Sequence, residues 1–346
     1  MSTQFSIQHA LSKVIANGHL GRDEARAVMS GIMEGAATPA QIGSLLTALR
    51  IKGETLDEIT GFAEAMRSKA LPIEVSKGNL LDTCGTGGDG AETFNISTAS
   101  ALVAAAGGIR VAKHGNRAMS SKSGSADVLE ALGVHIALSA EQTAACLEKV
   151  GICFMFAQSY HQSMKYAAGP RKELGFRTVF NLLGPLTNPA GADRQVLGVF
   201  DRDKTEVVAE VLQALGLKRA LVVASLDGLD EISISAPTKV TELKDDQIRT
   251  YELTPDDLGL RATSIKDVAG GDAGMNAEII HRIFSGERGA YRDIVLANAG
   301  ACFYVTGQCT TLQEGVKFAA AAIDSGKATA KLEELVQFTG ELSHVS

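Results

Sequence analysis

The sequence contains no tryptophan, and aromatic residues make up only 5% of the chain. Proteins that bind single-stranded nucleic acid stack bases on aromatic side chains, so this scarcity argues against that class. Basic residues are also in the minority, because 33 Lys and Arg stand against 40 Asp and Glu and the formal net charge is -7. A general nucleic-acid binder needs a basic surface to neutralise phosphates, and we therefore expect no nucleic-acid partner.

Disulfide, zinc and membrane signals are absent as well. The five cysteines are scattered without a CxxC pair, which predicts reduced thiols rather than a disulfide framework or a zinc site. Cys84 adjoins a glycine-rich stretch, but no His or charged residue is next to it to lower its pKa, so a packed thiol is a better interpretation than a nucleophile. No apolar run approaches the ~18 residues of a membrane span, and the first residues do not resemble a signal peptide. We expect a cytoplasmic protein without a membrane partner.

The 346 residues, 45% of them hydrophobic, are enough for one large domain or two unequal ones. The first seventy residues show helix signals only. Thr38 before Pro39 marks one helix start, and Thr55 with Glu58 forms a capping box at the next. A small helical module is therefore predicted, ending near Pro72.

From residue 79 the pattern changes to short apolar strands. Strands predicted at 79–82 and 109–112 flank a helix at 97–106, and a strand–loop–helix–strand unit implies a parallel sheet. Alternating polar and apolar residues at 232–234, 239–243 and 248–251 predict an antiparallel meander near an edge. Further apolar strands are expected at 152–156, 196–199, 220–224 and 295–296.

A glycine-rich turn follows the first of these strands. Its Gly-Thr-Gly-Gly-Asp sequence, residues 85–89, lets backbone N–H groups approach an anion closely. Asn95, Ser97 and Thr98 then begin a helix, and a helix N-terminus favours a bound phosphate. Whether Ser97 and Thr98 act only as helix caps remains open at this stage.

Two further clusters follow strands. Lys-His-Gly-Asn-Arg at 113–117, with serines between 120 and 125, places cations and hydroxyls where ligands bind in open parallel sheets. Together with the glycine loop, this indicates a phosphate pocket. Asp-Gly-Leu-Asp-Glu at 227–231 offers adjacent carboxylates, which suit a divalent cation. A solvated acidic turn is the alternative.

Five motifs in one order carry a resemblance to a known family. The stretches at 85–89, 95–98, 113–117, 181–189 and 227–231 are similar to those of the anthranilate phosphoribosyltransferases, over nearly the whole chain. The resemblance implies an α/β protein of the nucleoside phosphorylase-like phosphoribosyltransferase fold, with a small helical domain and a larger α/β domain around a mostly parallel sheet. It places the helical domain at 1–72, with 165–190 returning to it, and the α/β domain at 73–164 and 191–346. It also implies a homodimer.

The same resemblance implies transfer of the phosphoribosyl group of phosphoribosyl pyrophosphate to the amine of anthranilate, in tryptophan biosynthesis. Two magnesium ions would be held by Ser97, Asp230 and Glu231, and anthranilate by Gly85, Asn116 and Arg171. Residues implied to bind phosphoribosyl pyrophosphate are Gly85, Gly88, Asp89, Thr93, Asn95, Ile96, Ser97, Thr98, Lys113, His114, Gly115, Asn116, Arg117, Ala118, Met119, Ser120, Ser121 and Ser125.

No general base is evident, and we expect His114 to be structural or to position the acceptor. Arg171 follows Gly169 and Pro170, which predicts that it opens a helix. Gln158 and Gln162 stand where many relatives have proline, so the details of acceptor binding differ from the family pattern.

Three alternatives remain open from the sequence. A pyrimidine nucleoside phosphorylase would share the fold but leave the 181–189 segment unexplained. A non-enzymatic, nucleic-acid-binding relative should be basic and lack the acidic pair. A nucleotide-binding regulatory protein should show an adenine-recognition motif after the glycine loop.

Overall fold

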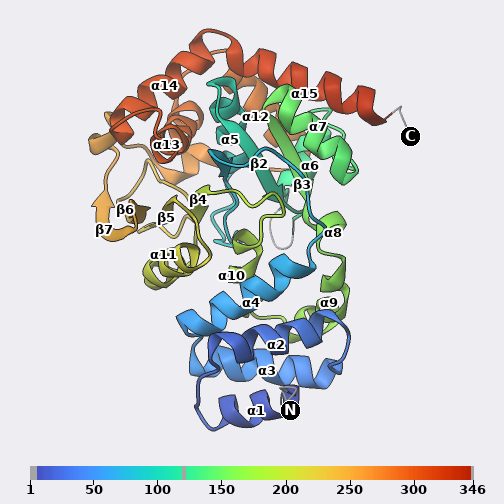
Figure 1. Ribbon diagram of the computed structural model, residues 1–346. Helices are drawn as coiled ribbons and strands as arrows, with labels where there is room; N and C mark the ends of the chain where they lie inside the picture. The colour runs from blue at the N-terminus through green and yellow to red at the C-terminus, as the bar shows by residue number, and fades with distance from the viewer. Residues whose placement is uncertain (1–5, 119–121, 344–346) are drawn as a thin grey trace.

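The computed structural model describes residues 6–118 and 122–343. A small helical part lies below a larger α/β part in the view of Figure 1. Met119, Ser120 and Ser121, which the sequence analysis assigned to the phosphate pocket, lie outside the described residues.

The helical part begins with α1 (Ile7–Ile15), α2 (Arg22–Met33), α3 (Pro39–Lys52) and α4 (Leu56–Lys69). Both predicted caps are confirmed, because the Thr38 hydroxyl accepts a hydrogen bond from the Gln41 N–H and the Thr55 hydroxyl accepts one from the Glu58 N–H. α2 packs against α4, and α1 packs against α3. The later helix α9 (Lys165–Leu174) contacts α2 and α3, so the chain returns to the helical part after leaving the sheet. The domain boundaries themselves stay predictions.

The α/β part is built on one sheet with the strand order β3-β2-β1-β4-β5-β6-β7. The first five strands of that order run parallel, and β6 and β7 are antiparallel, as the apolar runs and the alternating segments predicted. The carboxyl ends of the parallel strands therefore meet at one edge. The bounds are β1 (Leu80–Asp82), β2 (Arg110–Gly115), β3 (Ile152–Phe156), β4 (Arg194–Gly198), β5 (Arg219–Ser225), β6 (Thr238–Lys244) and β7 (Gln247–Leu253).

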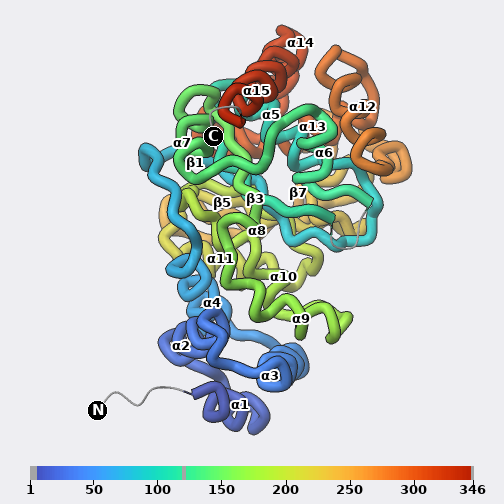
Figure 2. The backbone as a smooth tube through the Cα atoms, turned by 90° about the vertical axis from the view of Figure 1, so that its right-hand side faces the viewer, coloured from blue at the N-terminus to red at the C-terminus, as the bar shows by residue number. Residues whose placement is uncertain are grey.

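Helices cover both faces of this sheet. Figure 2 shows α5, α13 and α15 together at the end of the molecule far from the helical part, whereas α11 lies next to α4. The bounds are α5 (Ile96–Ala106), α6 (Ser125–Ala131), α7 (Ala140–Val150), α8 (Ala157–Tyr160), α10 (Phe180–Leu183), α11 (Thr205–Ala214), α12 (Ala273–Phe284), α13 (Ala290–Val305), α14 (Leu312–Asp324) and α15 (Lys327–Ser343).

Side chains of the sheet divide between two apolar clusters. In β5, Leu221 and Val223 join the cluster of the α/β part, while Val222 and Ala224 join one shared with α1–α4 and α11. Successive residues of a strand point to opposite faces, which explains this alternation. α11 packs against β5, β6 and α4, so it connects the helical part to this face of the sheet.

Two strand predictions were wrong. Val295 and Leu296 lie in the middle of α13, whose residues from Ile294 to Val305 are all buried. A short apolar run cannot distinguish a buried strand from a buried helix, because a helix buried on all sides loses its amphipathic period. Residues 232–234 form no strand either: the Ile232 N–H donates to Asn298 Oδ1, so a side chain takes the place of a neighbouring strand.

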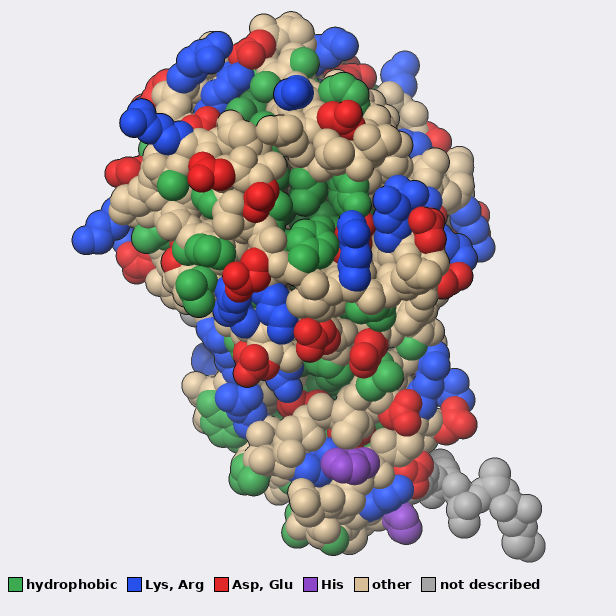
Figure 3. All heavy atoms as spheres, turned by 90° about the vertical axis from the view of Figure 1, so that its left-hand side faces the viewer, with side chains coloured by type: hydrophobic (Ala, Val, Ile, Leu, Met, Phe, Trp, Pro, Cys, Tyr) green, Lys and Arg blue, Asp and Glu red, His purple; other side chains and the backbone are tan. Residues whose placement is uncertain are grey.

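Among the described residues, no helix is long and apolar enough to cross a membrane. On the face drawn in Figure 3, basic and acidic side chains are interspersed.

Candidate active site

The glycine loop lies where the sequence predicted it, at the carboxyl end of β1, and it is held by contacts to β4 and to Asp230. The Thr86 N–H donates to the Gly198 carbonyl at 2.8 Å, and the Gly87 N–H donates to Asp230 Oδ2 at 2.7 Å. Gly87 and Gly88 have φ angles of 62° and 71°, a region that favours glycine. A Cβ on Gly198 would lie 1.5 Å from the Asp230 carbonyl oxygen, so glycine is required for this close approach.

Lys113 comes from β2 and is buried, with 2% of its surface exposed. Its Nζ donates to Thr83 Oγ1 at 3.1 Å and to Ser97 Oγ at 3.4 Å. A buried ammonium needs polar partners of this kind, and these contacts fix it between the glycine loop and the start of α5. Thr83 was not among the predicted site residues, although its position between a strand and the glycine loop indicated a place in the site.

The N-terminus of α5 carries no side-chain cap. Asn95 is the N-cap residue, but its side chain donates to the Ser123 carbonyl and accepts from Asn276 Nδ2 at 2.9 Å. Ser97 and Thr98 are therefore not caps, and Thr98 Oγ1 is buried without a hydrogen-bond partner among the described residues. The Ser97 N–H at the start of α5 faces the Glu231 carboxylate and lowers its pKa against the effect of burial, so this helix start is oriented to favour an anion. No sequence signal pointed to Asn276, which lies 181 residues from Asn95.

Three carboxylates gather opposite Lys113. Burial, and after it the nearby Asp89 carboxylate, raise the pKa of Asp230 to about 7. Burial and then Asp230 raise the pKa of Glu231 well above its usual range. Like charges packed together disfavour ionisation unless a cation is close, and Lys113 supplies only one positive charge. In the described ranges, no group of three or more His, Cys, Asp or Glu has the spacing of a complete metal site.

The segment at 181–189 braces the strands beneath this site. Asn188 Nδ2 donates to Asp82 Oδ2 at 2.8 Å and to the Ala112 carbonyl at 2.9 Å, which ties β1 to β2. Burial raises the pKa of Asp82 to about 6. Asp82 Oδ1 also accepts from the His114 N–H, so the ends of both strands are fixed relative to each other.

His114 and Cys84 have environments that suit packing. The His114 ring lies 5.1 Å from that of His161, centroid to centroid, and burial lowers the pKa of His114 to about 3. A histidine that stays neutral near pH 7 matches the expected structural or positioning role. Burial raises the pKa of the Cys84 thiol, which argues against a nucleophilic thiolate.

Arg117 is engaged on the surface. Its guanidinium pairs with Asp127 at 2.9 Å and with Glu130 at 2.5 Å. Asp127 also accepts from the Ala118 and Gly124 N–H groups, so it holds both of these residues at the start of α6. A direct role for the Arg117 side chain in phosphate binding stays a prediction.

The predicted acceptor residues come from two different elements. Asn116 follows β2, and its Oδ1 accepts from the Arg117 N–H at 2.8 Å and from Gln158 Nε2 at 3.4 Å. Arg171 lies inside α9 and does not open a helix, because α9 begins at Lys165 and continues through Pro170. A proline within the second turn removes an N–H but still permits the helix, which is why the sequence signal misled.

Arg171 has no carboxylate partner among the described residues. Its guanidinium carbon lies 4.9 Å from the centre of the Phe180 ring, and burial lowers the pKa of its guanidinium. The structure records no hydrogen bond or ion pair between Arg171 and the other predicted site residues within the described ranges.

The remaining predicted residues lie around the same loop and helix. Thr93 forms an isolated bridge with Ala269 that supports the end of the glycine loop. Gly85, Gly88 and Asp89 lie in the glycine loop itself. Ile96 begins α5, Ser125 begins α6, Gly115 is the last residue of β2, and Ala118 follows it.

Comparisons with known proteins identify relatives of this arrangement. Two family models match the chain, the glycosyl transferase family α/β domain over residues 77–329 and its helical bundle domain over residues 8–70. The anthranilate phosphoribosyltransferase of Acetivibrio thermocellus is 56% identical over 96% of both chains, and that of Brevibacillus brevis is 55% identical over 98% of this chain and 100% of the relative.

Solved structures agree with these sequence matches. The anthranilate phosphoribosyltransferase of Thermus thermophilus has a TM-score of 0.91 and 45% identity, with 95% of this chain and 99% of that chain covered. The Saccharomyces cerevisiae enzyme, solved in complex with PRPP and Mg, has a TM-score of 0.89 and 25% identity over 97% and 98% of the two chains. The fold with its small helical part, the ordered motifs at one sheet edge and these near full-length relatives lead to one conclusion: the chain belongs to the anthranilate phosphoribosyltransferase family of glycosyl transferases.

Proposed function

We propose that the chain transfers the 5-phosphoribosyl group of phosphoribosyl pyrophosphate to the amine of anthranilate and releases pyrophosphate, as a step of tryptophan biosynthesis. The single observation that carries this proposal is the convergence of Gly87, Ser97, Lys113 and Asp230 from four separate segments at the carboxyl edge of the sheet. That arrangement combines an anion-binding loop, an uncapped helix start, a buried cation and carboxylates. A donor with a pyrophosphate leaving group uses all four.

The donor's pyrophosphate binds over the glycine loop. The backbone of Gly85 and Gly88, the start of α5 at Asn95, and Lys113 supply N–H groups and a positive charge that stabilise the departing pyrophosphate. Thr93 supports the loop from behind through its bridge to Ala269. The full set proposed for this donor is Gly85, Gly88, Asp89, Thr93, Asn95, Ile96, Ser97, Thr98, Lys113, His114, Gly115, Asn116, Arg117, Ala118, Met119, Ser120, Ser121 and Ser125.

Two magnesium ions complete the donor site, held by Ser97, Asp230 and Glu231. The residues fit such ions, because Asp230 and Glu231 are adjacent and their pKa values are raised by burial and by neighbouring carboxylates. A nearby cation would offset that repulsion. Bound magnesium neutralises charge that develops on pyrophosphate. The Gly87 N–H holds Asp230 Oδ2 at 2.7 Å, so this carboxylate is oriented by the same loop that binds the donor.

Anthranilate binds between Asn116, Gly85 and Arg171. Arg171 has no acidic partner among the described residues, so its guanidinium is available to pair with the acceptor carboxylate in a fork geometry. Asn116 Oδ1 already accepts two hydrogen bonds, which leaves its Nδ2 group to donate to the acceptor. These contacts orient the amine toward the ribose C1, and no residue is assigned as a general base.

The protein acts in the cytoplasm as a homodimer that pairs through its helical domain. Ile15 and Ile51 support this choice of interface, because their side chains are 70% and 82% exposed in the helical part. The helical domain comprises residues 1–72 and 165–190, and the α/β domain comprises residues 73–164 and 191–346. Packing of α9 against α2 and α3 supports the discontinuous helical domain.

A fluorescence assay tests the activity directly. When the purified chain is mixed with anthranilate, phosphoribosyl pyrophosphate and Mg²⁺, the fluorescence of anthranilate should decrease with time. Omission of phosphoribosyl pyrophosphate, or an excess of chelator, should abolish this decrease. Parallel reactions with a pyrimidine nucleoside and phosphate should give no free base. Free base formed in the second reaction and an unchanged signal in the first would overturn the proposal in favour of a phosphorylase.

A further inference from the structure

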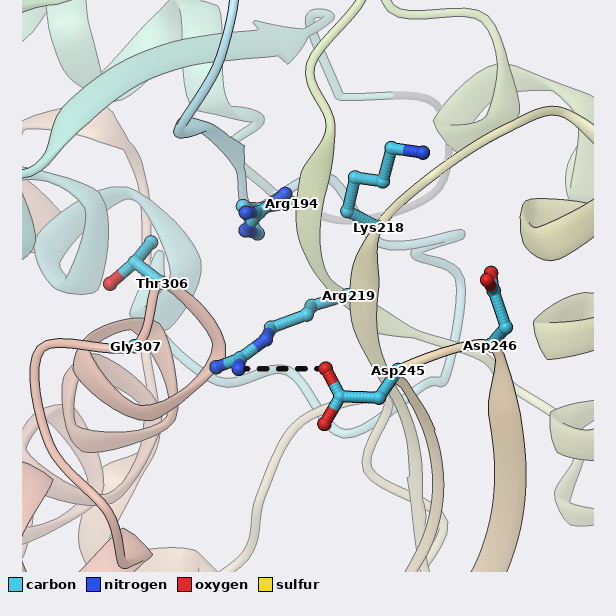
Figure 4. Close-up of a pocket in the computed structure, with 7 residues that line it drawn as sticks. All are labelled: Arg194, Lys218, Arg219, Asp245, Asp246, Thr306 and Gly307. Atoms are coloured by element: carbon cyan, nitrogen blue, oxygen red, sulfur yellow. Dashed lines mark ion pairs between the residues drawn. The ribbon is translucent and has the colours of Figure 1, made fainter.

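A cavity of about 410 Å³ lies at the amino ends of β4 and β5, at the edge of the sheet opposite the candidate active site (Figure 4). β4 runs from this cavity to Gly198, which contacts the glycine loop, so the strand separates the two places. None of the residues proposed to bind the donor, the acceptor or magnesium lines the cavity. Its lining residues are Arg194, Lys218, Arg219, Asp245, Asp246, Thr306 and Gly307.

Two arginines face each other directly across neighbouring strands. Arg194 and Arg219 are register partners in the parallel pair of β4 and β5, so their side chains leave the same face of the sheet. Like charges in this position repel each other and destabilise a sheet. Asp193 partly neutralises the charge of Arg194, because Asp193 Oδ2 accepts a hydrogen bond from Arg194 Nη1 at 2.9 Å. Arg219 has no comparable partner, since the nearest carboxylate oxygen, of Asp245, lies 3.9 Å from its Nη2.

Several N–H donors of the basic residues that line the cavity therefore have no acceptor in the described part of the chain. Within the described ranges, the Arg219 guanidinium makes no hydrogen bond, and Arg194 Nε is buried without a partner. The Lys218 ammonium has no acidic partner there either, and Figure 4 shows it extending to the other side of the strand. The Arg219 side chain extends toward Gly307, where a Cβ would lie 3.1 Å from Arg219 Nη1. The Arg219 side chain is 28% exposed, so its N–H groups can meet a ligand that enters the cavity.

We propose that this cavity binds an oxyanion of the phosphate class, held by the Arg219 guanidinium beside the positive charge of Arg194. The planar guanidinium fork matches phosphate oxygens and forms two parallel charged hydrogen bonds with them. Asp245 and Asp246 also line the cavity, so binding depends on Arg219 exchanging its long contact with Asp245 for these shorter bonds. The volume exceeds that of one phosphate group, which admits pyrophosphate or a small phosphorylated metabolite.

The absence of tryptophan makes the test selective. Gln308 is exposed and follows Gly307, so a Gln308→Trp variant carries the only indole of the chain beside the cavity. Inorganic phosphate and pyrophosphate, each added at constant ionic strength, should change its fluorescence saturably. The response should persist in Lys113→Ala, which weakens the active site, so binding there cannot account for it.

Variants of the cavity decide the outcome. In the Gln308→Trp background, Arg219→Gln should raise the dissociation constant for pyrophosphate by roughly tenfold or more. Arg50→Gln removes the same charge from an exposed position on α3 and should leave the constant unchanged. A response to pyrophosphate but not to phosphate identifies the larger anion as the ligand. No saturable response to either anion, or an equal response in Arg219→Gln, would overturn the proposal, while the catalytic assay remains an independent test of the main function.

Discussion

Arg171 offers a quantitative test of acceptor recognition. Its guanidinium stacks on Phe180 at 4.9 Å and has no carboxylate partner in the described part of the chain, so the carboxylate of anthranilate would be its first. A charged hydrogen bond in a partly buried place contributes about 1.5–3 kcal/mol, which corresponds to roughly tenfold to over a hundredfold in affinity. Arg171→Ala should therefore raise the KM for anthranilate by about that factor and leave the KM for phosphoribosyl pyrophosphate nearly unchanged.

Two control variants separate recognition from packing. Arg177 stacks on Phe200 at 4.1 Å, so Arg177→Ala removes a similar stacking contact from a residue outside the predicted motifs. Lys172→Ala removes one positive charge from the exposed neighbour on α9. Neither variant should change the KM for anthranilate by more than about twofold, because both keep the Arg171 guanidinium that pairs with the acceptor carboxylate.

The assay is steady-state loss of anthranilate fluorescence, with each substrate varied at saturating levels of the other. Arg171→Lys should recover only part of the loss, because an ammonium cannot form two parallel hydrogen bonds with a carboxylate. An unchanged anthranilate constant in Arg171→Ala would refute the reasoning. It would mean that the segment containing Gln158 and Gln162 directs the acceptor to another residue.

Three further predictions concern the donor site. Asp230→Asn combined with Glu231→Gln should abolish turnover, and retained activity would contradict the metal assignment. Calorimetry in chelator at pH 7 should nevertheless show an equal or higher Tm. The reason is that a carboxyl with a raised pKa in the fold costs stability that grows as the pH rises from its unfolded pKa through its folded one. Lys113→Ala should raise the Kd for phosphoribosyl pyrophosphate at least about tenfold and change the Kd for anthranilate little, as measured by titration calorimetry. Equal losses of affinity for both substrates would exclude the assigned role. Gly198→Ala should cost about 1–3 kcal/mol of stability and lower kcat, because the new Cβ would lie 1.5 Å from the Asp230 carbonyl oxygen. The control Gly43→Ala, whose Cβ would meet nothing within 4 Å, should be neutral or stabilising. Unchanged activity in Gly198→Ala would argue against close contact between β4 and the Asp230 loop.

Local features of the chain were determined by the sequence alone. The caps at Thr38 and Thr55, the short apolar strands and the glycine loop all depend on neighbouring residues, so their patterns are complete within a few positions. The parallel sheet followed from the strand–helix–strand order, and that order implied that the glycine loop and Lys113 share one edge. The family resemblance then added residue roles that no local pattern contains.

Only the tertiary structure decided which distant residues meet. Asp230 reaches the Gly87 N–H across 143 residues, and Asn276 reaches Asn95 across 181, contacts that depend on strand order and helix packing. The same packing buries α13 on every side, which erased the helical period around Val295 and made it look like a strand. Periodicity records the environment of one element, whereas a site assembled from several elements depends on how their buried faces fit together, and no single segment encodes that fit.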